Sequence, residues 1–208
     1  MGGVLYLRTA FGALALSVIT VGSVQAQAGG DVPPACTLDS VWVVESATAG
    51  ALPGQTSGTT WTLPQSLVLN AVGVARSTGT APAVRFRTQG DCNTSHTIRV
   101  SSLKGGLRRD AGPVDGFLSI RSMQYTAQWH QSQNGSTGGS NMGPIARINT
   151  TGVPGEAVSV PYVVAGSLPA PGDRRRFDVR LQINNAADNQ PMAAGAYSDT
   201  VTVTLSVN

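Results

Sequence analysis

Short stretches in which apolar and polar residues alternate recur along the chain. In Val84 to Arg87 the polar positions are arginines, and near the C-terminus they are mostly threonines. Alternation with a period of two places apolar side chains on one face of a β-strand and polar side chains on the other. The clearest strands are therefore predicted at Val84–Arg87, His96–Val100, Val158–Val164, Phe177–Ile183 and Tyr197–Val207.

Less regular segments of the same kind bring the expected total to about eight or nine strands. Clusters of Gly, Pro, Asn and Ser separate them, and two polar loops are expected at Gly50–Gly58 and Gln131–Gly143. Many short strands with turn signals between them predict one antiparallel sandwich of two sheets. The less regular strands are expected at Val41–Glu45, Trp61–Val74, Phe117–Trp129 and Ile145–Ile148.

The composition supports an all-β fold. Charged residues make up 12% of the chain, Lys104 is the only lysine, and Glu45 and Glu156 are the only glutamates. Helices usually carry Lys and Glu on their solvent face, whereas Thr, Val and Ser suit a pleated surface. Pro161 interrupts its strand, which favours an edge strand or a bulge at that position.

The N-terminus has the pattern of a secretory signal peptide. A basic start ends at Arg8, an apolar run follows from Ala10 to Val24, and small residues surround Ala26 and Ala28. This order predicts a leader over residues 1–26, with a cut after Ala26 or Ala28, and one domain over residues 27–208. No later apolar run has membrane-spanning length, so the mature chain is expected to lack a transmembrane segment and to be secreted to the periplasm, the outer-membrane surface or the medium.

The two cysteines, Cys36 and Cys92, are expected to form one disulfide, because export places them in an oxidising compartment. Charge gives little information on partners. The formal net charge is +3 and falls to about +2 when Arg8 leaves with the leader, so no nucleic-acid partner is expected.

Two segments carry a resemblance to a known family. The first runs from Asp91-Cys92-Asn93 through Ser101-Ser102-Leu103-Lys104-Gly105-Gly106-Leu107 to Tyr125, and the second is the tail Gly195-Ala196-Tyr197-Ser198-Asp199-Thr200-Val201-Thr202-Val203. The first segment resembles a pattern of secreted bacterial β-sandwich proteins, and the tail resembles the C-terminal strand of the spore-coat-U-like, archaic chaperone-usher pilins. The resemblance implies an immunoglobulin-like domain that lacks one strand and receives it from a neighbouring pilin subunit in a fimbria. It also implies a periplasmic chaperone and an usher as partners, and a structural place for Asp199 at the start of a strand.

The segment ahead of the first cysteine is a poor donor strand. Residues Gln27 to Ala35 are few and include two glycines and two prolines, so they neither alternate nor supply a continuous row of amides. This favours a tip subunit, a terminator or a non-polymerising relative over an ordinary shaft subunit.

No constellation of catalytic residues is evident. His96 and His130 are the only histidines, they lack metal-ligand spacing, and no serine lies in a nucleophile-elbow motif. We therefore expect a non-catalytic protein with no cofactor and no metal, in which both histidines are structural.

The leading hypothesis is a pilin-like structural or cell-adhesion protein that associates by strand addition. Its strand-edge residues would be Tyr197, Val201, Val203 and Leu205. The alternative is a freestanding periplasmic binding module for a glycan or an anionic ligand. In that module Trp129, the loop Gln131–Gly143 and the basic run Arg174, Arg175 and Arg176 would contact the ligand, while Arg85, Arg87, Arg99 and Arg180 would line outer strand faces.

Overall fold

A computed structural model describes most of the chain. The described residues are 3–10, 13–17, 36–46, 54–57, 60–64, 69, 83–92, 94–130, 141–163, 175–183 and 191–208. They contain strands and turns and no helix, which confirms the all-β fold class. In this part of the chain no helix could span a membrane.

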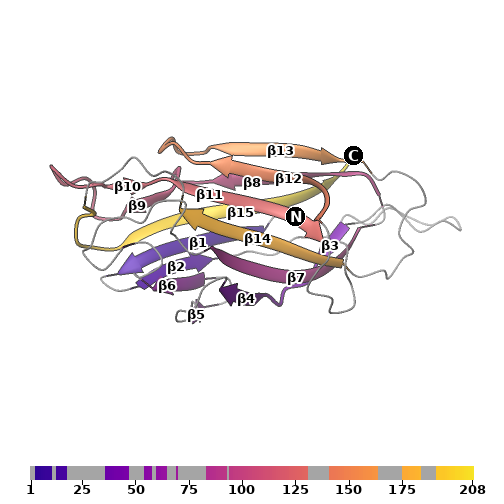
Figure 1. Cartoon of the computed structure of the whole chain (residues 1–208), viewed down its shortest axis with the longest axis horizontal. Helices are drawn as coiled ribbons and strands as arrows, with labels where there is room; N and C mark the ends of the chain where they lie inside the picture. The colour runs from indigo at the N-terminus through magenta and orange to yellow at the C-terminus, as the bar shows by residue number, and fades with distance from the viewer. Residues whose placement is uncertain are drawn as a thin grey trace, which may run out of the picture.

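The strands form two curled sheets (Figure 1). The first sheet contains β1 (Gly3–Ala10), β2 (Ala13–Ser17), β5 (Gly54–Ser57), β6 (Thr60–Pro64), β8 (His96–Ser102), β9 (Leu107–Arg109), β10 (Ile120–Arg121), β13 (Ala157–Tyr162) and β15 (Tyr197–Val207). The second contains β3 (Cys36–Leu38), β4 (Val43–Ser46), β7 (Val84–Cys92), β11 (Met123–His130), β12 (Asn141–Asn149) and β14 (Arg175–Ile183). Apart from a short parallel contact between β1 and β6, the strand pairs are antiparallel.

The five clear strand predictions are confirmed as β7, β8, β13, β14 and β15, and Ile145–Ile148 is confirmed as part of β12. The other less regular predictions are confirmed only in part. The predicted strand Val41–Glu45 corresponds to β4, which starts at Val43, and Phe117–Trp129 is divided into a bend, β10 and β11. The start of Trp61–Val74 lies in β6, and apart from Leu69 its residues after Pro64 lie outside the described residues. Val164 lies outside the described residues. Among the described strands β13 pairs only with β8, so Pro161 lies in an edge strand as predicted.

Two loop predictions need correction. Gly54–Ser57 forms strand β5, and β12 starts at Asn141, inside the expected loop Gln131–Gly143. Both segments consist mainly of small polar residues without apolar alternation, so pairing with a neighbouring strand, not their own pattern, makes them extended.

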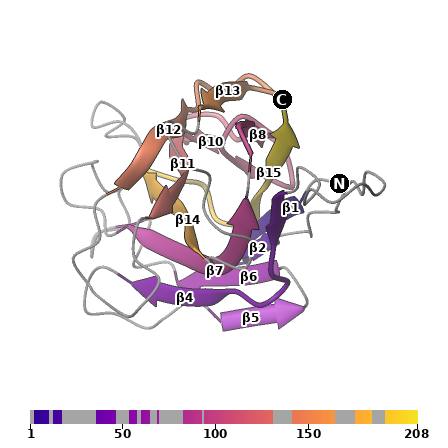
Figure 2. The same cartoon turned by 90° about the vertical axis from the view of Figure 1, so that its right-hand side faces the viewer.

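One apolar core lies between the two sheets, which curve around a common centre (Figure 2). Buried residues on β8 and β15 face those on β7, β11 and β14. Trp61 of the first sheet meets Phe86 of the second edge-to-face, with ring centroids 5.0 Å apart. The disulfide Cys36–Cys92 joins β3 to β7 across directly opposed positions, as predicted.

Candidate functional site

Strand β15 is the longest described strand and carries the four residues expected at an assembly edge. Tyr197, Val201, Val203 and Leu205 are all buried, and their side chains belong to the core. Opposed residues of one antiparallel ladder share a face, so the apolar set fixes the register of the strand. The side chains of the four predicted assembly residues therefore point into the core and are not presented on an outer surface.

The two edges of β15 have different partners. On one side it pairs with β8 from Val201↔Ser102 to Val207↔His96, and with the short β9 near its start. On the other side it pairs with β1 from Gly3↔Val203 to Arg8↔Ser198. Strand β1 belongs to the segment predicted as the leader, and in the full-length chain this segment pairs with one edge of β15 (Figure 1).

The start of β15 is fixed by the carboxylate of Asp199, which is 1% exposed. The Oδ2 atom accepts hydrogen bonds from Ser102 Oγ at 2.6 Å and from Tyr125 Oη at 2.8 Å. Further hydrogen bonds come from three backbone amides: Lys104 and Thr200 to Oδ1 at 2.9 and 2.7 Å, and Gly106 to Oδ2 at 3.2 Å. Asp199 therefore connects β15 to β8, to β11 and to the turn at Gly105 and Gly106.

The environment of this network shifts two pKa values. Burial raises the pKa of Asp199, and the hydrogen bonds from Ser102, Lys104, Tyr125 and Thr200 oppose that rise. Burial, followed by the charge of Asp199, raises the pKa of Tyr125 well above its usual value, so its hydroxyl keeps the proton that it donates. The resemblance implied a structural place for Asp199, and its first segment contains Ser102 and Tyr125, but nothing in the sequence connects the three residues, because their strands are far apart in the chain.

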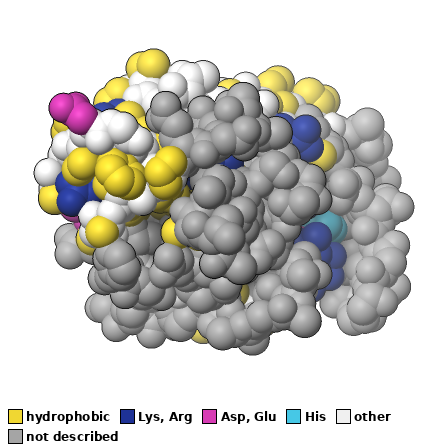
Figure 3. Space-filling view, turned by 60° about the vertical axis from the view of Figure 1, so that its left-hand side comes forward, with side chains coloured by type: hydrophobic (Ala, Val, Ile, Leu, Met, Phe, Trp, Pro, Cys, Tyr) yellow, Lys and Arg dark blue, Asp and Glu magenta, His cyan; other side chains and the backbone are white. Residues whose placement is uncertain are grey.

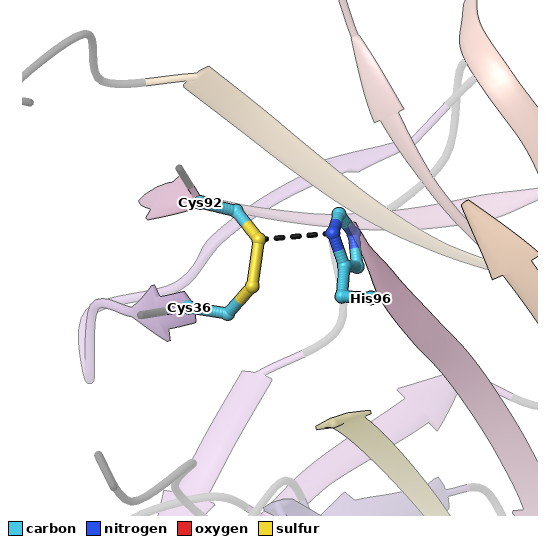
Figure 4. Close-up of side chains that lie close together, drawn as sticks. All are labelled: Cys36, Cys92 and His96. Atoms are coloured by element: carbon cyan, nitrogen blue, oxygen red, sulfur yellow. Dashed lines mark hydrogen bonds between the residues drawn. A yellow bond between two sulfur atoms is a disulfide. The ribbon is translucent and has the colours of Figure 1, made fainter. Parts of the chain in front are cut away.

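A second cluster surrounds the disulfide at the end of β7 (Figure 4). His96 is 1% exposed, and its Nδ1 lies 2.9 Å from Cys92 Sγ and 2.9 Å from the carbonyl oxygen of Thr94. On the other side of the ring, Nε2 accepts a hydrogen bond from Trp129 Nε1 at 2.9 Å. The sequence did not predict these contacts, because His96 lies near Cys92 in the chain but in no recognisable ligand motif.

The hydrogen bonds determine the protonation state of His96. A carbonyl oxygen only accepts, so Nδ1 carries the proton, and Nε2 is bare because it accepts from Trp129. Burial is the main cause that lowers the pKa of His96, which keeps the ring neutral. The ring is therefore wedged between the disulfide and the core as a neutral donor and acceptor.

The donor atoms of Cys36, Cys92 and His96 lie within 4.8 Å of one another, a set that resembles a metal site. Two observations argue for a structural role instead. The sulfur atoms are joined in a disulfide, and the His96 Nδ1 proton is committed to Thr94. A metal bound by all three residues would require reduction of the disulfide and loss of the hydrogen bond from His96 to Thr94.

The structure describes only some of the residues that would contact a ligand in the alternative hypothesis. Trp129 is 2% exposed and packs edge-to-face on Phe177, so the interpretation of Trp129 as a saccharide platform is wrong. The indole ring of Trp129 packs in the core, and its N–H donates to His96, which gives the buried N–H the hydrogen-bond partner that it requires. Arg175 and Arg176 are half-buried at the start of β14, whereas Arg174 and most of the loop Gln131–Gly143 lie outside the described residues.

Comparison with known proteins adds no family to this picture. No protein-family model matches the chain, and no curated protein matches it.

Proposed function

We propose that the mature protein is a non-catalytic, pilin-like subunit or adhesin of the bacterial surface, and that it associates through the edge of β15. The observation that carries the proposal is the pairing of β1 with β15 over six residue pairs, Gly3↔Val203 to Arg8↔Ser198. Those β1 residues lie in the segment that the sequence predicts to be removed on export.

Removal of the leader would leave the β15 edge without this partner. An unpaired edge beside a core presents backbone donors and acceptors that another strand can satisfy. Val201 and Val203 lie beneath that edge, so an incoming strand would contact apolar side chains as well as backbone. Strand addition of this kind supplies affinity through main-chain hydrogen bonds and specificity through alternate side chains.

The partner in this proposal is an extended segment of a periplasmic chaperone or of a neighbouring subunit, as the resemblance to archaic chaperone-usher pilins implies. Association would be asymmetric, because Gln27–Ala35 is a poor donor. The chain would accept a strand without giving one, as a tip or terminal subunit does. The rival binding module loses its aromatic platform with the burial of Trp129.

The test is thermal unfolding of the mature chain, residues 27–208 with the disulfide intact, in the presence of a synthetic peptide that copies residues 3–10. A peptide at a hundred times its dissociation constant stabilises the folded state by about 2.7 kcal/mol. For a chain of this size, that corresponds to a rise in Tm of about 5 to 10 °C.

Two controls distinguish pairing at the β15 edge from nonspecific binding of the peptide. A peptide in which Leu5 and Leu7 are replaced by Asp should produce no rise, because Leu5 lies opposite the buried Val201. The uncut chain, whose β15 edge is already paired with β1, should not respond to the unmodified peptide. If the mature chain is monomeric and no strand peptide, including extensions of candidate neighbouring subunits, changes its Tm, the proposal fails.

A further inference from the structure

The outer face of the second sheet carries five arginines, Arg85, Arg87, Arg147, Arg176 and Arg180, which we call the arginine face. They come from β7, β12 and β14, at positions that alternate with buried residues such as Phe86, Ala146 and Val179. Strand pairing therefore brings to one surface arginines that are up to 95 residues apart in sequence, since Arg85 lies directly opposite Arg180.

The carboxylate of Asp178 organises one part of this face. It is 1% exposed, with His130 Nε2 2.8 Å from Oδ2 and Arg87 Nε 3.3 Å from Oδ1. The Nε atoms of Arg85 and Arg176 each lie 3.5 Å from a carboxylate oxygen. Three guanidinium groups thus share a single negative charge, and Figure 3 shows Lys or Arg side chains beside a histidine at the molecular surface.

A row of residues across the same sheet carries positive charges with fewer carboxylates beside them. Thr126 on β11 lies opposite Arg147 on β12 and opposite Arg180 on β14, and Arg180 lies opposite Arg85. The row is therefore Arg147, Thr126, Arg180, Arg85, and Glu45 of β4 follows opposite Arg85 at its far end. Like charges on adjacent strands destabilise a sheet, so this arrangement has a cost in the isolated protein.

Arg180 is the centre of the row. Its Nη2 donates to Gln182 Oε1 at 3.1 Å, whereas its Nε is buried and has no hydrogen-bond partner. Burial and then the charges of Arg85 and Arg147 lower the pKa of Arg180. An oxyanion placed between Arg180 and Arg147 would accept from both guanidinium groups and would relieve their mutual repulsion.

We propose that the row Arg147, Thr126, Arg180 and Arg85 binds a phosphate or sulfate ester group. The planar donors of arginine match the oxygen atoms of such a group, and the Thr126 hydroxyl lies between the two flanking arginines in the register. This site lies on the second sheet, whereas the β15 edge lies on the first, so it is independent of the proposed strand addition.

The shared chemistry is a tetrahedral oxyanion, and its source is either a free anion or a lipid head group. The first arm of the test titrates the mature protein with inorganic phosphate at low ionic strength by calorimetry. The second arm measures sedimentation with phosphatidylcholine vesicles that contain phosphatidic acid, against vesicles of phosphatidylcholine alone. Binding in the first arm assigns a free anion, and binding confined to the second assigns a membrane-borne phosphate.

Variants locate the site. We expect Arg180→Gln to weaken binding at least tenfold and Thr126→Val, which keeps the branched shape, to weaken it about threefold. Arg99→Gln is the matched control, because Arg99 is exposed on β8 of the first sheet. Arg180→Gln also removes a repulsion, so its Tm should not fall, and its response to the strand peptide should be unchanged.

Two results would overturn the proposal. One is the absence of phosphate or vesicle binding at low ionic strength. The other is an equal loss of affinity in Arg180→Gln and Arg99→Gln, which would show that only the net charge matters.

Discussion

Replacement of Asp199 by Asn tests the anchor of β15 most directly. Oδ1 accepts the amides of Lys104 and Thr200, and Oδ2 accepts the hydroxyls of Ser102 and Tyr125. An Asn side chain supplies one acceptor oxygen and one NH₂ donor. Its less costly orientation keeps the oxygen on the two backbone amides and turns the NH₂ toward the two hydroxyls.

The expected magnitude follows from the bonds lost. In that orientation the three hydrogen bonds to Oδ2 disappear, namely those from the two hydroxyls and the longer one, at 3.2 Å, from the Gly106 amide. A hydrogen bond to an ionised group is worth about 1.5 to 3 kcal/mol. Because the NH₂ group can donate weakly to the hydroxyl oxygens and so offsets part of this loss, we expect Asp199→Asn to lower the free energy of unfolding by at least about 3 kcal/mol. Tyr125→Phe removes a single bond and should cost about 1.5 kcal/mol.

The assay is urea unfolding at pH 7 with the disulfide intact, followed by tryptophan fluorescence. The double variant should lose clearly less than the sum of the two single losses, because Asp199 and Tyr125 share one hydrogen bond. A loss below about 1 kcal/mol for Asp199→Asn, or strict additivity in the double variant, would refute the view that this carboxylate ties the two sheets together.

Three further predictions concern the rest of the core. Burial holds the pKa of His96 below 6.5, so protonation of this residue favours the unfolded chain. Its contribution to stability is complete above pH 6.5 and declines as the pH falls toward the folded-state pKa. Urea unfolding measured as a function of pH should show this decline, and His96→Gln should reduce it. Replacing Cys36 and Cys92 by Ala removes a disulfide between residues 56 apart and should lower the free energy of unfolding, measured in urea, by about 4 kcal/mol. A loss below about 1 kcal/mol would contradict the loop-entropy reasoning. At Gly106, where φ is +123°, an added Cβ would lie 2.6 Å from a backbone oxygen, so Gly106→Ala should lower Tm strongly. Gly112→Ala is the control, because Gly112 also has a positive φ, +83°, but no atom lies within 4 Å of the added Cβ, and its loss in Tm should be much smaller. Equal losses would show that only the backbone angle matters.

Local patterning was sufficient to predict most of the strands. Val84–Arg87 and Phe177–Ile183 alternate strictly, because one face of each carries apolar core residues and the other carries charged or polar residues, such as Arg85 and Arg180. Strands β3 and β9 were missed, because three residues are too few to show a period. Pairing with the long strands β7 and β15, not intrinsic preference, holds these pieces extended.

The polar clusters around Asp199 and His96 could not be predicted from sequence patterns. Asp199 is 97 residues from Ser102 and 74 from Tyr125, and nothing local to any of them identifies the others. His96 is only four residues from Cys92, yet its hydrogen bond to Trp129 depends on how the two sheets pack. Sequence identified the residue types, and the topology decided which of them meet.

The anchoring of β15 bears on whether its edge would persist if residues 1–26 were removed, as the proposed function requires. Among the described residues, every group that bonds the Asp199 carboxylate lies on β8, on β11, in the adjoining turn or on β15 itself. None of these groups belongs to β1 or β2, so removal of residues 1–26 would leave this network complete. Val201 and Val203 are held on their other side by β8, at Ser102 and Val100. The β15 edge would therefore be positioned by the remaining part of the chain, and an incoming strand would meet a register that is already set by the buried side chains beneath it.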